Sequence, residues 1–314
     1  MNILISNDDG YFSRGIAVLK NVSRRYGAIR AVAPDRERSA ASNSLTLDRP
    51  LDILRKDDET FAVTGTPTDC VYLAVNAMSD FRPDVVFSGI NHGANLGDDT
   101  LYSGTVAAAM EGYMLGLPAV AFSIADKSDL YWDTAELAAE KFIPYFLALD
   151  LKFPILWNVN IPKARPDELK GFVFANLGRR LRRGNLTVET INPNGRKMWW
   201  IGALSKEAEA NKTSDFYFNS QGYVTVTALT ADFTNFSQME QLRASAPDFP
   251  ALGEAAESRG DDGAKRFPAP DPAPALAPKA PGAGSGRPRL ARPASKAAGK
   301  TAGRRNKPNG VGGK

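Results

Sequence analysis

Residues 1–10 read MNILISNDDG, a short apolar run that ends abruptly in polar and acidic residues. The run at residues 2–6 predicts a buried strand. Further along the chain, similar runs predict strands at 29–33, 61–64, 85–88, 119–123 and 155–159. Apolar residues at helical spacing, an Ala-rich segment and a helix-opening proline predict helices around 16–22, 67–77, 103–115 and 134–148. This alternation predicts an α/β fold with a mostly parallel sheet and helices on both faces.

Beyond about residue 171 the alternation stops. Residues 197–201 and 223–227 have the pattern of strands, and no helix of any length is predicted between them. We therefore expect a core of about residues 1–170, followed at about 171–245 by a β-rich appendix that forms a hairpin arm.

Residues 249–314 differ in composition from the rest of the chain. They hold 13 Lys or Arg against 5 Asp or Glu, a net charge of +8, whereas residues 1–248 hold 26 basic and 30 acidic residues, a net charge of −4. The same 66 residues contain 10 of the 21 prolines and 11 of the 27 glycines. Such a segment cannot bury enough apolar surface to offset its conformational entropy, so we expect a disordered tail. It is either a solubilising extension or an electrostatic arm for nucleic acid, polyphosphate or another polyanion.

The chain has one cysteine and one histidine, which limits its chemistry. An intramolecular disulfide and a Cys/His zinc site are both excluded. A metal ion would have to be held mainly by oxygen, which points to magnesium, manganese or calcium. The N-terminus lacks the basic region of a signal peptide, and the chain has no apolar run of about 18 residues, so we expect a cytoplasmic protein without a membrane span.

Asp8 and Asp9 follow the first predicted strand, at the edge where open α/β sheets bind ligands. Two adjacent carboxylates repel each other, and they are stable together if a cation neutralises them or if water solvates them well. The stretch NDDG at 7–10 is also typical of an ordinary turn. From these residues alone, a metal site and a plain turn both stay open.

Further oxygen-bearing side chains follow other strands of the predicted sheet. Ser39 lies shortly after the second strand, and Asn91, His92 and Asn95 follow the strand at 85–88. Hard divalent cations accept such a mixture of oxygens and usually retain several waters. These strand ends are therefore expected to face one crevice.

Residues 102–105, YSGT, lead directly into the helix predicted at 103–115. A helix N-terminus with free N–H groups and hydroxyl side chains suits a phosphate, although Ser and Thr are also ordinary N-caps. A neighbouring metal site favours the phosphate interpretation. The chain has no Walker loop, no G-x-G-x-x-G and no G-x-S-x-G, so kinase-like, dinucleotide-binding and α/β-hydrolase functions lose their main support.

Six stretches in order along the chain carry a family resemblance: SNDDG (6–10), APDRERS (33–39), SNSLT (42–46), GTPTDCV (65–71), SGINHGANLG (88–97) and YSGTVAAAMEG (102–112). Together they resemble the SurE family, the survival-protein nucleotidases, which are metal-dependent acid phosphatases. A weaker similarity continues through 213–216, 222–227 and 232–234, so the resemblance covers about residues 1–245 and leaves the tail unmatched. Ala228 stands where the family usually has a proline, a departure that concerns the local turn.

The resemblance implies that Asp8, Asp9, Ser39 and Asn91 hold one divalent ion per subunit, Mg²⁺ or Mn²⁺. It implies that Asn95, Ser103, Gly104 and Thr105 surround the substrate phosphate. It also implies a Rossmann-like three-layer α/β/α core with an exchanged β-hairpin or C-terminal segment, and a homodimer or homotetramer. We expect the nucleotidase domain to span residues 1–248.

The expected reaction is metal-dependent hydrolysis of nucleoside 5′- and 3′-monophosphates by an activated water, with polyphosphate cleavage as a side activity. Asp8 is expected to be the firmer metal ligand, and Asp9 to orient or deprotonate the water. His92 is either a peripheral residue or a proton shuttle. Two other functions stay open, namely a nucleotide sensor without turnover and a polyanion-binding protein that uses the basic tail.

Overall fold

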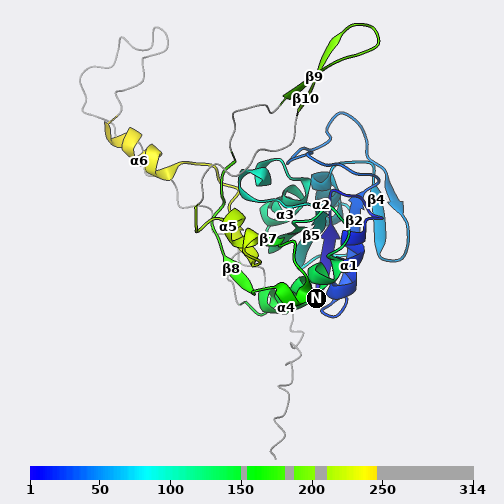
Figure 1. The fold of residues 1–314 in the computed structure, drawn as a ribbon. Coiled ribbons are helices and arrows are strands. Elements are labelled where there is room, and N and C mark those ends of the chain that lie inside the picture. Colours follow the sequence, from blue (N-terminus) through cyan, green and yellow to red (C-terminus); the bar gives the residue numbers. More distant parts are fainter. Residues whose placement is uncertain (150–153, 181–186, 202–210, 246–314) are drawn as a thin grey trace, which may run out of the picture. The chain divides into compact units, whose positions relative to one another are not determined.

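The computed structural model describes residues 1–149, 154–180, 187–201 and 211–245 (Figure 1). The chain divides into two units, Met1–Thr234 and Asn235–Lys314. Within the first unit, the central sheet has nine strands in the order β3-β4-β2-β1-β5-β6-β7-β11-β8.

β1 (Asn2–Ser6) pairs in parallel with β2 (Ala28–Pro34) on one side and with β5 (Val85–His92) on the other. Beyond β2 lie β4 (Thr60–Val63), which is parallel to it, and β3 (Ile53–Arg55), which is antiparallel to β4. Beyond β5 lie β6 (Ala119–Ile124) and β7 (Leu156–Ile161), both parallel. The predicted, mostly parallel α/β sheet is confirmed. β3 has three exposed residues and no alternating pattern, which is why the sequence did not reveal it.

Two layers of helices cover the sheet (Figure 1). α1 (Arg14–Ser23) and α4 (Trp132–Leu147) pack on one face, and α2 (Pro67–Asn76) and α3 (Gly104–Met114) pack on the other. The side chains of β1 alternate between the two layers, because Ile3 and Ile5 lie in the core with α1 and α4, whereas Leu4 lies in the core with α2 and α3. All three are fully buried. The expected three-layer α/β/α core is confirmed.

The strand order reverses at the centre of the sheet. From β1 the chain passes through α1 to β2 and then to β4, and α2 brings it back to β5 on the opposite side of β1. In sheets of this kind a crevice opens beyond the carboxyl ends of the two central strands. Asp8 follows β1, and Asn91 is the next-to-last residue of β5. Both therefore lie at this crevice.

The stretch from 171 to 245 is divided between the sheet and separate elements. β11 (Val224–Leu229) pairs antiparallel with β7, and β8 (Phe172–Phe174) pairs in parallel with β11. β9 (Thr187–Ile191) and β10 (Lys197–Ile201) form a separate two-stranded antiparallel sheet. β8 and β11 extend the central sheet, so they do not belong to the expected arm, and an arm within 171–245 stays a prediction. β8 and β11 extend the sheet because Val224 and Val226 complete the core beside β7.

Short helices complete the described chain. They are η1 (Gly97–Leu101), η2 (Pro166–Glu168), α5 (Asp215–Ser220) and, in the second unit, α6 (Phe236–Ser245). α5 corrects the expectation of no helix between 201 and 223; with six residues it is too short for helical periodicity to show in the sequence. The predicted tail, 249–314, lies outside the described residues. None of the helices in the described ranges is long and apolar enough to cross a membrane.

Candidate active site

A cavity of about 1080 Å³ lies at the carboxyl ends of the central strands. Six of the eight predicted site residues line it: Asp8, Asp9, Ser39, Asn91, Asn95 and Ser103. Gly104 and Thr105 lie directly behind this lining, at the start of α3. The structure therefore brings together residues that are up to 97 positions apart in the chain.

The turn after β1 presents the two carboxylates. Asn7 is fully buried, and its side-chain Nδ2 donates hydrogen bonds to Gly10 O at 3.0 Å and to Ser13 Oγ at 2.7 Å. The Gly10 N–H in turn donates to Asn7 Oδ1 at 3.2 Å. Asn7 thus holds the turn closed from within, and Asp8 and Asp9 are left to face the cavity. The stretch is both a turn and an acidic site, so the two interpretations of NDDG do not exclude each other.

Burial sets the electrostatics of these carboxylates. Desolvation raises the pKa of Asp8 to about 6, the Thr105 hydroxyl opposes this shift by donating a hydrogen bond to Asp8 Oδ1, and the charge of Asp9 adds to it. Desolvation also raises the pKa of Asp9, against the hydrogen bond that the His92 N–H donates to Asp9 Oδ2 at 3.1 Å. No Lys or Arg among the described residues forms an ion pair with either carboxylate. A bound cation would remove this unfavourable accumulation of negative charge.

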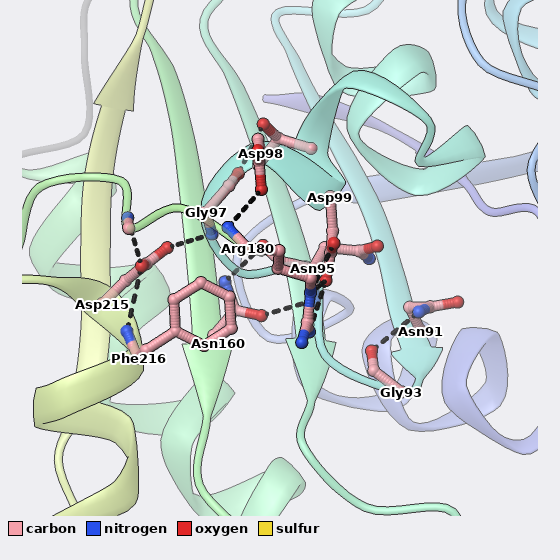
Figure 2. A network of polar contacts seen from close by, with 12 residues as sticks. Asn91, Gly93, Asn95, Gly97, Asp98, Asp99, Asn160, Arg180, Asp215 and Phe216 are labelled. Carbon is pink, nitrogen blue, oxygen red and sulfur yellow. Dashed lines mark hydrogen bonds and ion pairs between the residues drawn. The ribbon is translucent and has the colours of Figure 1, made fainter. Parts of the chain in front are cut away.

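Ser39 and Asn91 add neutral oxygen atoms. The Ser39 hydroxyl donates to Glu37 Oε1 at 2.7 Å. Asn91 Nδ2 donates to Gly93 O at 2.7 Å, which leaves the amide oxygen of Asn91 for another partner (Figure 2). In the described part of the chain no group of three or more His, Cys, Asp or Glu residues forms a metal cluster. Two carboxylates with hydroxyl and amide oxygens nevertheless fit a hard divalent ion that keeps some of its waters.

The N-terminus of α3 faces the same cavity. Ser103 is its N-cap, and Ser103 Oγ accepts a hydrogen bond from the Val106 N–H at 3.1 Å, so the ordinary capping role is present. Thr105 is fully buried and its hydroxyl binds Asp8. The Thr105 hydroxyl thus supports Asp8 in this structure, and its contact with a phosphate stays a prediction. The Val106 N–H is taken by Ser103 Oγ and the Thr105 N–H is directed at Asp8, so the Ser103 hydroxyl and the Gly104 N–H are the groups of this turn that suit an anion.

Asn95 is held by two asparagines of β7 that the sequence analysis did not single out. The Asn95 N–H donates to Asn160 Oδ1 at 2.8 Å, and Asn95 O accepts from Asn158 Nδ2 at 2.8 Å (Figure 2 shows Asn95 and Asn160). Both asparagines are buried. Polar residues at alternate positions of an otherwise apolar strand could have indicated them, because buried amides need partners.

His92 lines the cavity opposite α3. Its ring centroid lies 5.4 Å from that of Trp132, and its Nε2 lies 3.8 Å from Asp129 Oδ1. Its backbone N–H orients Asp9, a role that any residue at this position could fill. Arg180, Asp98 and Asp99 also line the cavity. No motif in the sequence pointed to them.

The turn after β6 leads to the cavity-lining Lys127 and carries a strongly stabilised carboxylate. Burial disfavours the charge of Asp126, but hydrogen bonds from Ser128 and the ion pair with Lys163 at 3.0 Å outweigh it and lower the pKa of Asp126 to about 2. Because the pKa is lower in the folded chain, this stabilisation is present above pH 4 and is lost as the pH falls toward 2.

We expect Asp126→Asn to lower the free energy of unfolding by about 2 kcal/mol at pH 7. The difference from the parent protein should shrink between pH 4 and pH 2, as measured by urea unfolding over a pH series. A difference that stays constant across this range would contradict the assignment.

Comparison with known proteins places this site in a family. The family model "Survival protein SurE" matches residues 3–184. The 5′-nucleotidase SurE of Neisseria gonorrhoeae is 48% identical over 244 residues, which cover 78% of this chain and 98% of that protein. The 5′-nucleotidase SurE of Chromobacterium violaceum is 45% identical over 242 residues, which cover 77% and 98%.

A solved structure agrees with the sequence matches. The crystal structure of the SurE protein from Aquifex aeolicus superposes with a TM-score of 0.69 at 36% identity, covering 78% of this chain and 99% of that chain. The six ordered motifs, the parallel sheet and the acidic crevice therefore have one common explanation, which is that the chain belongs to the SurE family.

Proposed function

We propose that the protein hydrolyses nucleoside 5′-monophosphates to nucleoside and phosphate with the help of one divalent cation per subunit, Mg²⁺ or Mn²⁺. One observation carries this proposal: the buried carboxylate of Asp8 and the half-buried carboxylate of Asp9 line a single cavity beside Ser103, the N-cap of α3. This arrangement offers a cation site beside an anion site, which is what a phosphomonoester requires. The relatives from Neisseria gonorrhoeae and Chromobacterium violaceum carry the name 5′-nucleotidase, which supports the same conclusion.

Asp8, Asp9, Ser39 and Asn91 would hold the cation. When bound, it supplies Lewis-acid stabilisation of the transferring phosphoryl group and lowers the pKa of a water. Thr105 fixes the position of Asp8 through its hydroxyl.

Asp9 has one oxygen that accepts the His92 N–H. Its other oxygen orients the attacking water and receives a proton from it. The Gly104 N–H and the Ser103 hydroxyl bind phosphate oxygens while the water oxygen bonds to phosphorus and the bond from phosphorus to the ester oxygen breaks. The departing nucleoside oxygen takes up a proton from solvent.

A phosphate-release screen tests this proposal. The full chain is incubated with the common nucleoside 5′- and 3′-monophosphates and short polyphosphates, each with Mg²⁺, Mn²⁺ or Ca²⁺ or with a chelator. We expect release from 5′-monophosphates that depends on Mg²⁺ or Mn²⁺, with 3′-nucleotides and polyphosphate as weaker substrates. Tight binding of a nucleotide without any release would instead identify a sensor.

Gly104→Ala tests the juxtaposition of cation and anion sites. A Cβ at Gly104 would lie 2.7 Å from Asp8 Cβ and 3.0 Å from Asp8 Oδ2, so Asp8 would have to move. We expect Mn²⁺ affinity, measured by calorimetry, to fall about tenfold or more, because an acidic ligand is displaced while α3 is kept.

Gly116→Ala is the matched control at the other end of the same helix. Its added Cβ meets nothing within 4 Å, although its φ of +85° makes any side chain strained. It should lower stability and leave Mn²⁺ affinity unchanged. Equal losses of Mn²⁺ affinity in both variants would contradict the assignment of Asp8 to the cation.

Oligomeric state and the role of the tail are further parts of the proposal. Trp199 and Trp200 of β10 are 62% and 64% exposed, which supports a homodimer or homotetramer that buries this two-stranded sheet. Light scattering of the parent and of a Trp199→Ser/Trp200→Ser variant tests it, and an unchanged mass would reject it.

Deletion of 249–314 is expected to leave phosphate release intact. If the tail is an electrostatic arm, the deletion also removes salt-sensitive RNA or DNA binding.

A further inference from the structure

A buried carboxylate outside the cavity ties three segments together. Asp215, at the start of α5, is fully buried and does not line the cavity. Its Oδ2 accepts a hydrogen bond from the Gly97 N–H at 2.7 Å, and its Oδ1 accepts from the Gly178 N–H at 2.8 Å and the Phe216 N–H at 2.9 Å (Figure 2). No Lys or Arg of the described ranges pairs with it. Its charge is therefore held by peptide N–H groups, and the pKa of Asp215 is still raised by burial.

The three segments lie so close together that neither Gly97 nor Gly178 has room for a side chain. A Cβ at Gly97 would lie 2.5 Å from Gly178 O and 2.5 Å from the Phe216 ring, and a Cβ at Gly178 would lie 2.4 Å from that ring. Gly97 also has a φ of +56°. Both glycines are required by this close contact. The position of Gly97 is consequently fixed by Asp215 and Phe216 on one side and by Gly178 on the other.

A second set of contacts joins the same segments, between Arg180 and the next residues of η1. The Arg180 guanidinium binds Asp99 in a paired contact, with Nε 2.7 Å from Oδ1 and an Nη atom 2.6 Å from Oδ2. The Arg180 N–H donates to Asp98 Oδ1 at 3.1 Å. The guanidinium also lies over the Phe216 ring, 4.7 Å from its centroid. Asp215 and Arg180, which we call the η1 clamp, thus hold both the first and the third residue of η1.

η1 leads directly to the anion side of the cavity. It ends at Leu101, and the next residues are Tyr102 and the N-cap Ser103. The Tyr102 N–H donates to Asp99 O at 3.0 Å, so the position of Asp99 is passed on to the residue before the cap. The carboxylates of the cation side have a support of their own, since Asn7 closes their turn, although Asp8 also accepts from Thr105 in the first turn of α3. A change in the η1 clamp should therefore act mainly on the anion side and more weakly on the cation side.

We propose that the η1 clamp positions the phosphate-binding end of α3, with Asp215 and Arg180 acting as positioning residues for nucleotide hydrolysis. The nucleotide substrate in this inference is taken from the proposed function, whereas the expected effect on the affinity for phosphate does not depend on it. Misplacing a bound group by a fraction of an ångström is costly, because orientation contributes strongly to rate and affinity.

The test compares Asp215→Asn with the parent protein in the full chain. Asparagine keeps the shape of the side chain, but its NH₂ group cannot accept a hydrogen bond and would face one of the peptide N–H groups. Calorimetry with inorganic phosphate in the presence of Mn²⁺, and with Mn²⁺ alone, gives two affinities. We expect the phosphate Kd to rise about tenfold or more and kcat/KM to fall by a similar factor, while the Mn²⁺ Kd rises by a clearly smaller factor, because Asn7 still closes the turn that carries Asp8 and Asp9.

Ile143→Ala is the control for loss of stability alone. Ile143 is fully buried late in α4, and α4 lies on the core face that α1 also covers. In a parallel α/β sheet each helix runs back against the strands, so this part of α4 lies far from their carboxyl ends. The control should lower the melting temperature and leave both affinities unchanged. An Asp215→Asn protein that behaves like this control would overturn the proposal.

Arg180→Lys serves if Asp215→Asn does not fold. Lysine keeps the charge but cannot make the paired contact with Asp99. We expect a rise of about threefold in the phosphate Kd with a smaller rise in the Mn²⁺ Kd; an unchanged phosphate Kd would overturn the proposal. If the parent protein releases no phosphate from any nucleotide, the proposed function fails, whereas the two affinities still decide whether the η1 clamp acts on the phosphate site.

Discussion

Asp8→Asn is expected to reduce phosphate release from a nucleoside 5′-monophosphate at least about a thousandfold. Asn keeps the shape of the side chain and an oxygen for the Thr105 hydroxyl, but it cannot carry the negative charge that holds a divalent cation. Losing the cation removes several kcal/mol of transition-state stabilisation, and each 1.4 kcal/mol is about a factor of ten in rate. The measurement is release of inorganic phosphate at saturating nucleotide and Mn²⁺.

The same substitution should not weaken the fold. Burial raises the pKa of Asp8 to about 6, so in the folded chain its ionised form is disfavoured. Because this pKa lies above that of the unfolded chain, the charge lowers stability above pH 6, and this penalty disappears as the pH falls toward 4. With a chelator at pH 7.5, we expect Asp8→Asn to be more stable than the parent by about 3 kcal/mol, and equal to it near pH 4.

Asp58→Asn is the matched control for the activity measurement. Asp58 has 97% of its side chain exposed and, among the described residues, forms an ion pair with Arg55 alone, so the same chemical change there should leave phosphate release unchanged. Full activity of Asp8→Asn would reject the assigned site. Loss of activity together with a loss of stability would mean that Asp8 supports the fold and does not hold the cation.

Gly15→Ala is expected to have the largest effect on stability, a loss of more than about 3 kcal/mol. The Cβ of alanine would lie 1.8 Å from Ile90 O and 2.8 Å from Ile90 C, and both atoms belong to the backbone of β5. A strand in the middle of a nine-stranded sheet cannot move aside without breaking its pairing with β1 and β6. Urea unfolding gives the difference in the free energy of unfolding.

Helix propensity alone predicts the opposite sign for this substitution. Gly15 is the second residue of α1, and alanine is favoured over glycine within a helix by about 1 kcal/mol. Ala17→Gly, at an exposed position of the same helix, measures what propensity is worth there and should cost about 1 kcal/mol. A Gly15→Ala protein as stable as the parent would show that α1 can shift away from β5.

Much of the fold follows from local patterns in the sequence. The strand at 2–6 and the helix opened by Pro67 lie where the sequence predicts them, because apolar periodicity and a capping proline act over a few residues. β5 runs to His92, four residues beyond the predicted end, since its last residues are polar but still pair with β6. β8 has three residues, which leaves too little pattern to predict its place at the edge of the sheet.

The shared cavity of Asp8, Ser39 and Asn91 could be predicted because the carboxyl ends of parallel strands meet at one edge. Asp8 follows β1, Asn91 lies near the end of β5 and Ser39 lies in the loop after β2, so a parallel sheet brings them to the same edge. Thr105 could be placed near the site, but only the structure shows that its hydroxyl turns to Asp8. The sequence does not reveal that choice, because a hydroxyl binds whichever acceptor the packing offers.

The sequence by itself determines the alternation of strands and helices, the shortage of Cys and His, and the strand ends that carry Asp8, Asp9, Ser39 and Asn91. Only the tertiary structure decides what holds η1, next to the start of α3, in place. Asp215 accepts from Gly97, 118 residues away, and Arg180 pairs with Asp99, 81 residues away. Peptide N–H groups are the same at every residue, so no pattern marks the ones a buried carboxylate will accept. Their partners are fixed when η1, residues 176–180 and α5 pack against one another.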